Sequence, residues 1–178
     1  MKIIHQTAVI GTNVTIEDDV YIGPLCVIGF PAEWKGHESY CKGVLIKSGT
    51  RLTGLVTIDS GAERVTEIGP DCYILKKAHI GHDAIIGEGT TLSCNSIIGG
   101  HTEIGKKCNI GLGAIIHQKL VIPDYVMIGM GGIVTKKSNI ESWNIYAGNP
   151  VKLLSLNTHL IKECKEEYDR YLQNTIPK

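Results

Sequence analysis

The sequence has no long apolar run, no excess of either charge and few aromatic residues. Lysine and arginine number 18, as do aspartate and glutamate, so the balance gives no sign of nucleic-acid binding. Nowhere do about 18 apolar residues run together, as a membrane-spanning helix requires, and the start, MKIIHQTAVIG, lacks the apolar stretch of a signal peptide. We therefore expect a cytoplasmic protein that binds neither nucleic acid nor membrane.

The cysteines form no CxxC pair, although the chain has six of them. A chain of 178 residues, 43% of them hydrophobic, can build a core without disulfides. Cys26, Cys72 and Cys108 also occupy repeat positions that favour small side chains. We expect buried free thiols and no bound metal; a disulfide or metal role is the alternative.

The chain repeats an aliphatic residue every six positions, a period that fits neither a helix nor simple strand alternation. Small or β-branched residues stand two positions before these anchors, and glycine often follows directly after, as in Gly81 and Gly99. The anchors are Ile4, Ile10, Ile16, Ile22, Ile28, Ile46, Leu52, Ile58, Ile68, Ile74, Ile80, Ile86, Leu92, Ile98, Ile104, Ile110, Ile116, Ile122, Ile128 and Val134. We interpret the repeat as short strands joined by tight corners, with glycine where a corner needs an unusual backbone angle.

This pattern resembles the hexapeptide-repeat family, in which three hexads form one coil and the coils stack as a left-handed parallel β-helix. The resemblance implies an all-β fold over residues 1–149. Residues 29–43 and 59–67 interrupt the repeat and are expected to leave it as loops, because they add residues between anchors. After Pro150 the apolar spacing becomes helical, so residues 150–178 are expected to form a C-terminal helix, over 150–173, and a tail. That helix is expected to cover the open end of the stack or to pack on a neighbouring subunit.

Four of the seven histidines lie near anchors that are 18 residues apart. His79 and His82 flank Ile80, His101 follows Ile98, and His117 follows Ile116. With three hexads to a coil they cluster on three successive coils, within about 10 Å along the axis. Histidine suits base catalysis near neutral pH, so the column indicates an enzyme.

Three segments make the resemblance more specific: AHIGHD (78–83), GGH (99–101) and GAIIHQ (113–118). They are similar to segments of the UDP-N-acetylglucosamine O-acyltransferases of lipid A biosynthesis, as are, more loosely, IGFPAEWK (28–35) and VTIDSG (56–61). The resemblance implies that His82 is the general base, that Asp83 orients it, and that the Gly100 N–H stabilises the oxyanion. It implies substrate contacts for His79, His101, His117, Gln118, Lys35 and Met130, and active sites between the subunits of a homotrimer. For Lys35 a solvated loop position is the alternative, and Trp34 is expected either to stack on a ligand or to anchor its loop.

Two departures favour a short acyl group. The C-terminal region is shorter than in the acyl-carrier-protein-dependent enzymes, and IYAGNPVKLL (145–154) is closer to acetyl-CoA-dependent transferases. Met130 is also bulkier than the small residue usual in the acyl groove. We therefore expect transfer from an acyl-CoA, acetyl-CoA above all, to a hydroxyl or amino group of a nucleotide sugar, with no tightly bound cofactor. An acyl-carrier-protein donor is the main alternative.

Two other classes use this architecture. In zinc carbonic anhydrases of the γ type the close histidine pair is five residues apart, whereas His79 and His82 are three apart. A non-catalytic scaffold is the other alternative, since fold alone does not establish activity. The histidine column argues against a scaffold, which has no need of stacked titratable groups.

Overall fold

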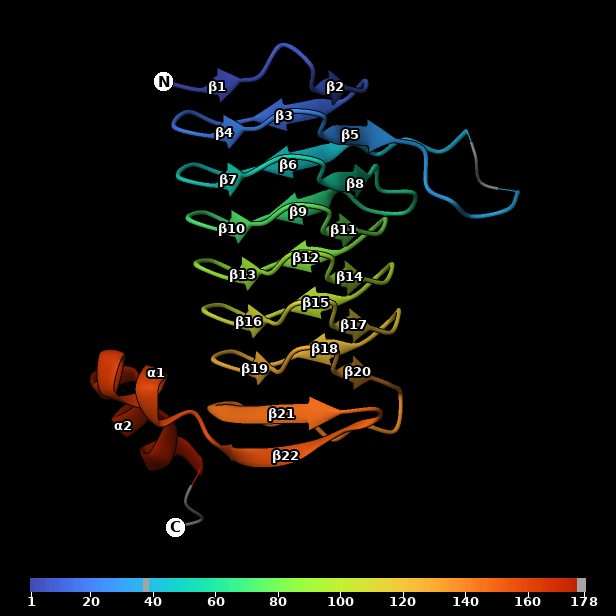
Figure 1. Ribbon diagram of the computed structural model, residues 1–178. Coiled ribbons are helices and arrows are strands. Elements are labelled where there is room, and N and C mark those ends of the chain that lie inside the picture. Colours follow the sequence, from blue (N-terminus) through green and yellow to red (C-terminus); the bar gives the residue numbers. More distant parts are fainter. Residues whose placement is uncertain (37–38, 176–178) are drawn as a thin grey trace.

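Three parallel sheets wind into a solenoid of about eight turns, which confirms the predicted left-handed parallel β-helix. In this computed structural model, which describes residues 1–36 and 39–175, each coil up to β18 contributes one strand to each sheet (Figure 1). Partners in register are 18 residues apart through the regular coils: Ile80 pairs with Ile98, and Ile98 with Ile116. Three hexads per coil therefore hold as expected.

The strands are very short because each hexad leaves only a few residues between corners. Sheet A consists of β1 (Ile3–Ile4), β4 (Tyr21–Ile22), β7 (Arg51–Leu52), β10 (Tyr73–Ile74), β13 (Thr91–Leu92), β16 (Asn109–Ile110), β19 (Met127–Ile128), β21 (Asn144–Gly148) and β22 (Val151–Leu156). Sheet B consists of β2 (Val9–Ile10), β5 (Val27–Phe30), β8 (Thr57–Asp59), β11 (His79–Ile80), β14 (Ile97–Ile98), β17 (Ile115–Ile116) and β20 (Ile133–Val134). Sheet C consists of β3 (Val14–Ile16), β6 (Val44–Ile46), β9 (Thr66–Ile68), β12 (Ile85–Ile86), β15 (Glu103–Ile104) and β18 (Val121–Ile122).

The interior is a stack of aliphatic anchors, and from Ile22 to Val134 they are buried. The small residues two positions earlier are buried beside them, among them Cys26, Cys72 and Cys108, which are free thiols as expected. Burial raises the pKa of Cys72 to about 11 and that of Cys108 to about 12, so both are protonated at neutral pH. Each fully buried aliphatic side chain contributes about 1.5–3 kcal/mol, which makes this column the main source of stability.

The glycine directly after an anchor takes the expected unusual backbone angle at Gly29, with φ 81°, but not at Gly81 or Gly99. At these two positions glycine is needed because successive coils approach closely. A Cβ on Gly81 would lie 2.8 Å from the Gly100 nitrogen, and one on Gly99 would lie 2.5 Å from the Gln118 nitrogen. The left-handed backbone occurs two positions further on, where Asp83 has φ 60° and His101 has φ 57°. Non-glycine residues adopt this conformation at a cost, and at functional sites such strain is common.

The C-terminal region differs from the expected helix over 150–173. Val151–Leu156 instead forms β22, which runs antiparallel to β21 and satisfies the backbone groups at the edge of sheet A. The helices α1 (Thr158–Glu163) and α2 (Lys165–Thr175) follow, with Asn157 capping α1 by accepting a hydrogen bond from the Leu160 N–H at 3.3 Å. They lie beside β19 and β21 rather than over the end of the stack (Figure 1). No helix in the described ranges is long and apolar enough to cross a membrane.

Candidate active site

Both loop insertions leave the solenoid at one edge, the corner where each strand of sheet B turns into sheet C. We call this edge the B–C corner. The first loop follows β5, and the second, residues 60–65, follows β8. On the next coils the same corner holds residues 81–84, 99–102 and 117–120, which carry His82, His101 and His117. The insertions and the histidine segments, which are far apart in sequence, therefore share one edge of the molecule.

His82 and Asp83 form a short polar contact at this corner. His82 Nδ1 lies 2.6 Å from Asp83 Oδ2, and the side chains are 14% and 0% exposed. An ionised carboxylate accepts a hydrogen bond from Nδ1–H, and this leaves Nε2 of a neutral ring as an acceptor. The pair therefore has the arrangement of a general base and its orienting carboxylate.

The second loop holds the other oxygen of Asp83. Backbone N–H groups of Ala62, Glu63 and Arg64 donate to Oδ1 at 3.1, 2.8 and 2.6 Å. Burial raises the pKa of Asp83, but the hydrogen bonds from Arg64, His82 and Glu63 outweigh it and hold the pKa below its ordinary value. Asp83 therefore stays ionised at neutral pH although it is fully buried.

Arg64 joins the second loop to two coils of the solenoid. Its Nε donates to the Asp83 carbonyl at 2.7 Å, and its Nη1 lies 2.7 Å from Glu103 Oε1 on β15. The Asp83 N–H donates to Thr66 Oγ1 at 2.9 Å, which secures the same corner from the other side. The extra residues that lengthen the anchor spacing from Ile58 to Ile68 thus fold into a support for Asp83.

Aromatic contacts hold the rings of His82 and His101 in place. The Trp34 ring stacks on His82 with centroids 5.4 Å apart and makes an edge contact with His101 at 5.9 Å. His82 and His101 meet edge to face at 4.9 Å, and His101 Nε2 lies 3.6 Å from Asp83 Oδ2. The Trp34 ring packs on the two histidines, which fits the expected role as an anchor of its loop, and stacking on a ligand stays a prediction because Trp34 also lines the adjacent cavity.

Gly100 leaves room for the base. A Cβ on Gly100 would lie 2.6 Å from His82 Nε2 and 2.9 Å from Cε1, so only glycine fits beside the ring. The Gly100 carbonyl accepts from the Lys119 N–H at 2.9 Å. Within residues 1–36 and 39–175, no hydrogen bond engages the Gly100 N–H. An unengaged backbone N–H is the kind of group that can stabilise an oxyanion, so this role of Gly100 stays a prediction.

Two further predicted site residues, His79 and His117, form hydrogen bonds with groups outside the His82–Asp83 pair. His79 projects from sheet B, bonds Thr57 Oγ1 through Nδ1 at 2.8 Å, and lies 3.9 Å from Asp59 Oδ2. Burial raises the pKa of Asp59, and the charge of Glu33 adds to the rise, although His79 and His82 oppose it. The exposed His117 bonds the Gln118 carbonyl through Nδ1 at 2.8 Å.

Lys35 and Met130 are not brought to His82 within one chain. Lys35 is exposed on the first loop and does not line the cavity beside the histidines. Met130 lies at another edge, the corner between sheets A and B, and is 75% exposed. Both assignments remain predictions. Asp59 follows the anchor Ile58, which pairs with Ile80 as the spacing indicated. Sequence reasoning missed Arg64, because its role depends on folded contacts and only the irregular anchor spacing marked its place.

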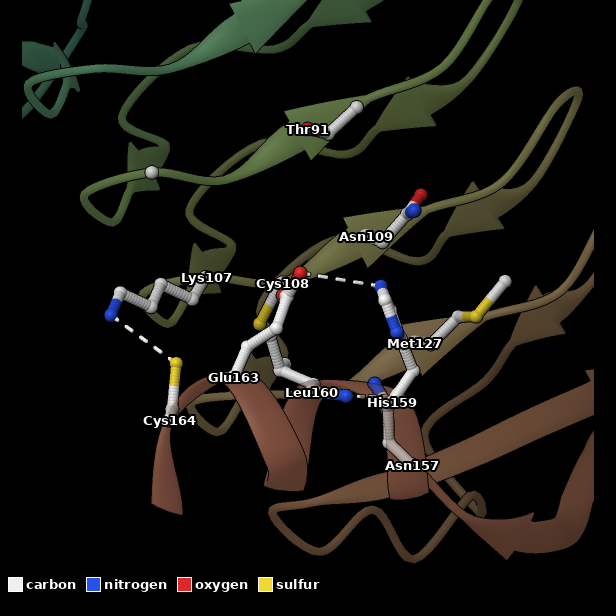
Figure 2. A pocket seen from close by; sticks show the side chains of 11 residues that line it. Thr91, Lys107, Cys108, Asn109, Met127, Asn157, His159, Leu160, Glu163 and Cys164 are labelled. Atoms are coloured by element: carbon white, nitrogen blue, oxygen red, sulfur yellow. Dashed lines mark hydrogen bonds and ion pairs between the residues drawn. The ribbon is translucent and has the colours of Figure 1, made fainter. Parts of the chain in front are cut away.

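A cavity of about 210 Å³ opens beside the rings and is lined by Glu33, Trp34, His82, His101, Gln118 and Lys119. A larger cavity of about 490 Å³ lies elsewhere, between the C-terminal helices and sheet A (Figure 2). The smaller cavity is the candidate active site because it is lined by His82, which bonds Asp83 through Nδ1, and by His101, whereas neither residue lines the larger cavity.

A metal could also be considered at this corner, since ligand atoms of His82, Asp83 and His101 lie within 4.8 Å of one another. Asp83 Oδ1 already accepts three backbone N–H groups, and Oδ2 holds His82 Nδ1. This leaves two imidazole nitrogens, fewer than the three protein ligands of known catalytic zinc sites. The donor set therefore fits an oriented base better than a zinc centre.

Comparison with known proteins agrees with the repeat. Residues 66–100 match the family model described as bacterial transferase hexapeptide (six repeats). The chain is a hexapeptide-repeat protein. This hexapeptide-repeat protein is 26% identical over 170 residues to the acyl-[acyl-carrier-protein]–UDP-N-acetylglucosamine O-acyltransferase of Campylobacter concisus, covering 86% of this chain and 64% of the relative. With the enzyme of the same name from Burkholderia orbicola it shares 32% identity over 132 residues, 72% of this chain and 49% of the relative.

The solved UDP-N-acetylglucosamine acyltransferase of Campylobacter jejuni superimposes with a TM-score of 0.78 at 22% identity, covering 94% of this chain and 81% of that one. At this identity the likeness establishes the fold alone. The hexapeptide-repeat protein spans about half to two-thirds of the length of the two curated relatives, so their activity as whole enzymes is not carried over here.

Proposed function

We propose that the protein is an O-acyltransferase that moves an acyl group from a thioester to a sugar hydroxyl of UDP-N-acetylglucosamine or a close analogue. The observation that carries this proposal is the His82–Asp83 pair, in which Nδ1 bonds the carboxylate and Gly100 lies beside the ring. The names of the relatives support the acceptor and the reaction type. They also favour an acyl-carrier-protein thioester over acetyl-CoA, so we propose the carrier protein as the donor.

In the proposed reaction His82 Nε2 removes the proton of the sugar hydroxyl, because that hydroxyl is a weak nucleophile at neutral pH. The oxygen attacks the thioester carbonyl, and the Gly100 N–H stabilises the negative charge on the carbonyl oxygen. The intermediate collapses to the sugar ester while the protonated His82 returns its proton to the departing thiolate. Asp83 keeps the ring oriented and stabilises the imidazolium throughout.

A homotrimer is part of the proposal. The cavity of about 210 Å³ is smaller than the roughly 300–1,000 Å³ of typical ligand pockets, so one chain encloses only part of a nucleotide sugar. Exposed apolar residues also continue along sheet B and its edge, including Val27, Ile97, Ile115 and Met130. A neighbouring copy would cover them and close the site. Light scattering on the purified protein tests the stoichiometry.

The activity test is a matrix of donors and acceptors. Acyl-carrier-protein thioesters of several chain lengths and acetyl-CoA are each incubated with UDP-N-acetylglucosamine, other UDP-sugars and dTDP-sugars, and thiol release is measured. His82→Ala is expected to lower the sugar-dependent rate about 10²–10⁴-fold. His159→Ala is the control, because that side chain is 85% exposed on α1, outside the histidine cavity.

Each outcome of the matrix decides one part of the proposal. Turnover with acetyl-CoA alone would replace the donor and restore the short-acyl expectation. Equal rates in wild type and His82→Ala would remove His82 as the base. Zinc bound stoichiometrically, with activity lost on chelation, would replace the base mechanism by a metal mechanism.

A further inference from the structure

A lysine and a cysteine from distant parts of the chain meet at the wall of the larger cavity. Lys107 occupies the corner between β15 and β16, and Cys164 lies between α1 and α2, 57 residues later. The Lys107 Nζ points at the Cys164 sulfur from 3.3 Å (Figure 2). The contact joins that corner directly to the helix junction. Among the described residues it is the one side-chain contact between these two places that an oxygen atom could bridge covalently, with loss of hydrogen alone.

The surroundings hold both groups in place. Cys164 is 6% exposed and packs against Tyr125 and Trp143, which stack with centroids 3.7 Å apart. The backbone of Lys107 is fixed at its corner. Its N–H donates to the Glu88 carbonyl at 2.7 Å, and its φ of 50° lies in the left-handed region. Glu167 Oε1 lies 3.5 Å from the same Nζ. The amine and the thiol therefore face each other between two well-packed elements.

The groups around the pair favour reaction between these two and no other partner. The hydrogen bond to Cys164, with the nearby Glu167, raises the pKa of Lys107, so the amine meets the sulfur as an ammonium. Cys108 lines the same cavity, but it bonds the carbonyls of Lys106 and Pro123, and burial raises its pKa to about 12. The cavity of about 490 Å³ gives a small oxidant access to the contact.

We propose that Lys107 and Cys164 form a covalent N–O–S bridge, with molecular oxygen as the oxidant. The thiol, the ammonium and one O₂ give the bridge Nζ–O–Sγ, one water and one proton. The S–H bond, two N–H bonds and the O=O bond are broken, one N–O bond, one S–O bond and the two O–H bonds of water are formed, and the sulfur and nitrogen are oxidised as O₂ is reduced. Two equivalents of a dithiol reduce the bridge to lysine, thiol and water, and each dithiol becomes a disulfide.

The bridge would tie the C-terminal helices to the solenoid. The described contacts between them are otherwise non-covalent: the aromatic cluster, the Lys107–Glu167 ion pair and the Asn157 N–H bond to the Trp143 carbonyl at 2.7 Å. Closing a loop of 57 residues constrains the unfolded chain and so stabilises the docked helices. The proposal is independent of acyl transfer, because neither residue lines the histidine cavity.

The test is intact-mass spectrometry of the full-length protein, purified without oxygen and then exposed to air-saturated buffer. The expected product gains one oxygen atom and loses two hydrogen atoms, returns to the starting mass with dithiothreitol, and yields a peptide pair joined through Lys107 and Cys164. Cys164→Ser and Lys107→Arg are expected to abolish the product. Cys94→Ser is the matched control that should retain it, since Cys94 does not line the cavity.

Other mass changes would overturn the proposal. Gain of oxygen without loss of hydrogen indicates sulfenic acid, and loss of two hydrogens without oxygen indicates a sulfenamide or a disulfide. An unchanged mass after prolonged exposure to air would overturn it as well. Because the wild-type mass decides between these outcomes, the test does not depend on the folding of any variant.

Discussion

Replacing Asp83 with asparagine probes the base and its support in a single change. The three backbone donors at Oδ1 require an acceptor, so the amide oxygen must occupy that position. The amide NH₂ then replaces Oδ2 and faces His82 Nδ1, at the 2.6 Å contact. Its N–H can only donate, so Nδ1 becomes an acceptor and the ring proton moves to Nε2.

This change of tautomer removes the base while leaving the ring in place. We expect the rate with UDP-N-acetylglucosamine to fall about 10²–10⁴-fold, the range for loss of general-base catalysis. Nitrogen NMR of the His82 ring would detect the proton on Nε2 in the variant and on Nδ1 in wild type. Asp71→Asn is the control, because Asp71 occupies an equivalent corner position with φ 55° but lies outside the histidine cavity.

Stability should respond as well, with a defined dependence on pH. Three hydrogen bonds to a carboxylate become bonds to a neutral amide, and we expect a loss of about 1–3 kcal/mol in the free energy of unfolding. The folded-state pKa of Asp83 is lowered, so its contribution is present above the unfolded-state pKa and is lost as pH falls through the folded pKa. Urea unfolding from about pH 7 to about pH 3 should therefore show the two proteins converging in acid.

Two results would refute this reasoning. If the rate of Asp83→Asn matched wild type, Asp83 would not set the tautomer of His82. A stability difference that stayed constant down to the lowest pH would show that the carboxylate is not preferentially ionised in the folded protein.

Three further changes test the corner and the acyl site. Gly100→Ala places a methyl group 2.6 Å from His82 Nε2. Displacement of the ring should lower kcat in a turnover assay, and overpacking should lower the free energy of unfolding in urea by about 1–3 kcal/mol. Unchanged values in both assays would mean that the ring has room to move. Arg64→Ala removes the 2.7 Å bonds to the Asp83 carbonyl and to Glu103, and we expect a loss of about 1–3 kcal/mol with a reduced kcat; a stability loss with full kcat would limit Arg64 to a structural role. Met130→Gly should shift the preference among carrier-protein thioesters toward longer acyl chains, and an unchanged preference would exclude Met130 from the acyl groove.

At the B–C corner, some features could be predicted from the sequence and others required the folded structure. The histidine segments were recognisable because the resemblance to the hexapeptide-repeat family gives three hexads to a coil, and positions 18 residues apart then stack. The contact of Trp34 with His82 could not be predicted in this way, because the first loop has no repeat to fix its register. The role of Arg64 was hidden for the same reason, although the longer spacing from Ile58 to Ile68 marked the place.

Sequence alone determined the coil of the solenoid, its aliphatic interior and the column of histidines, because each depends on a local period repeated many times. Tertiary structure decided the rest. It showed that glycine after the anchors is required by contact between coils, that Val151–Leu156 pairs with an exposed strand edge before any helix begins, and that Met130 lies at a different edge from His82. These features depend on which backbone approaches which across the stack, and a one-dimensional period does not carry that information.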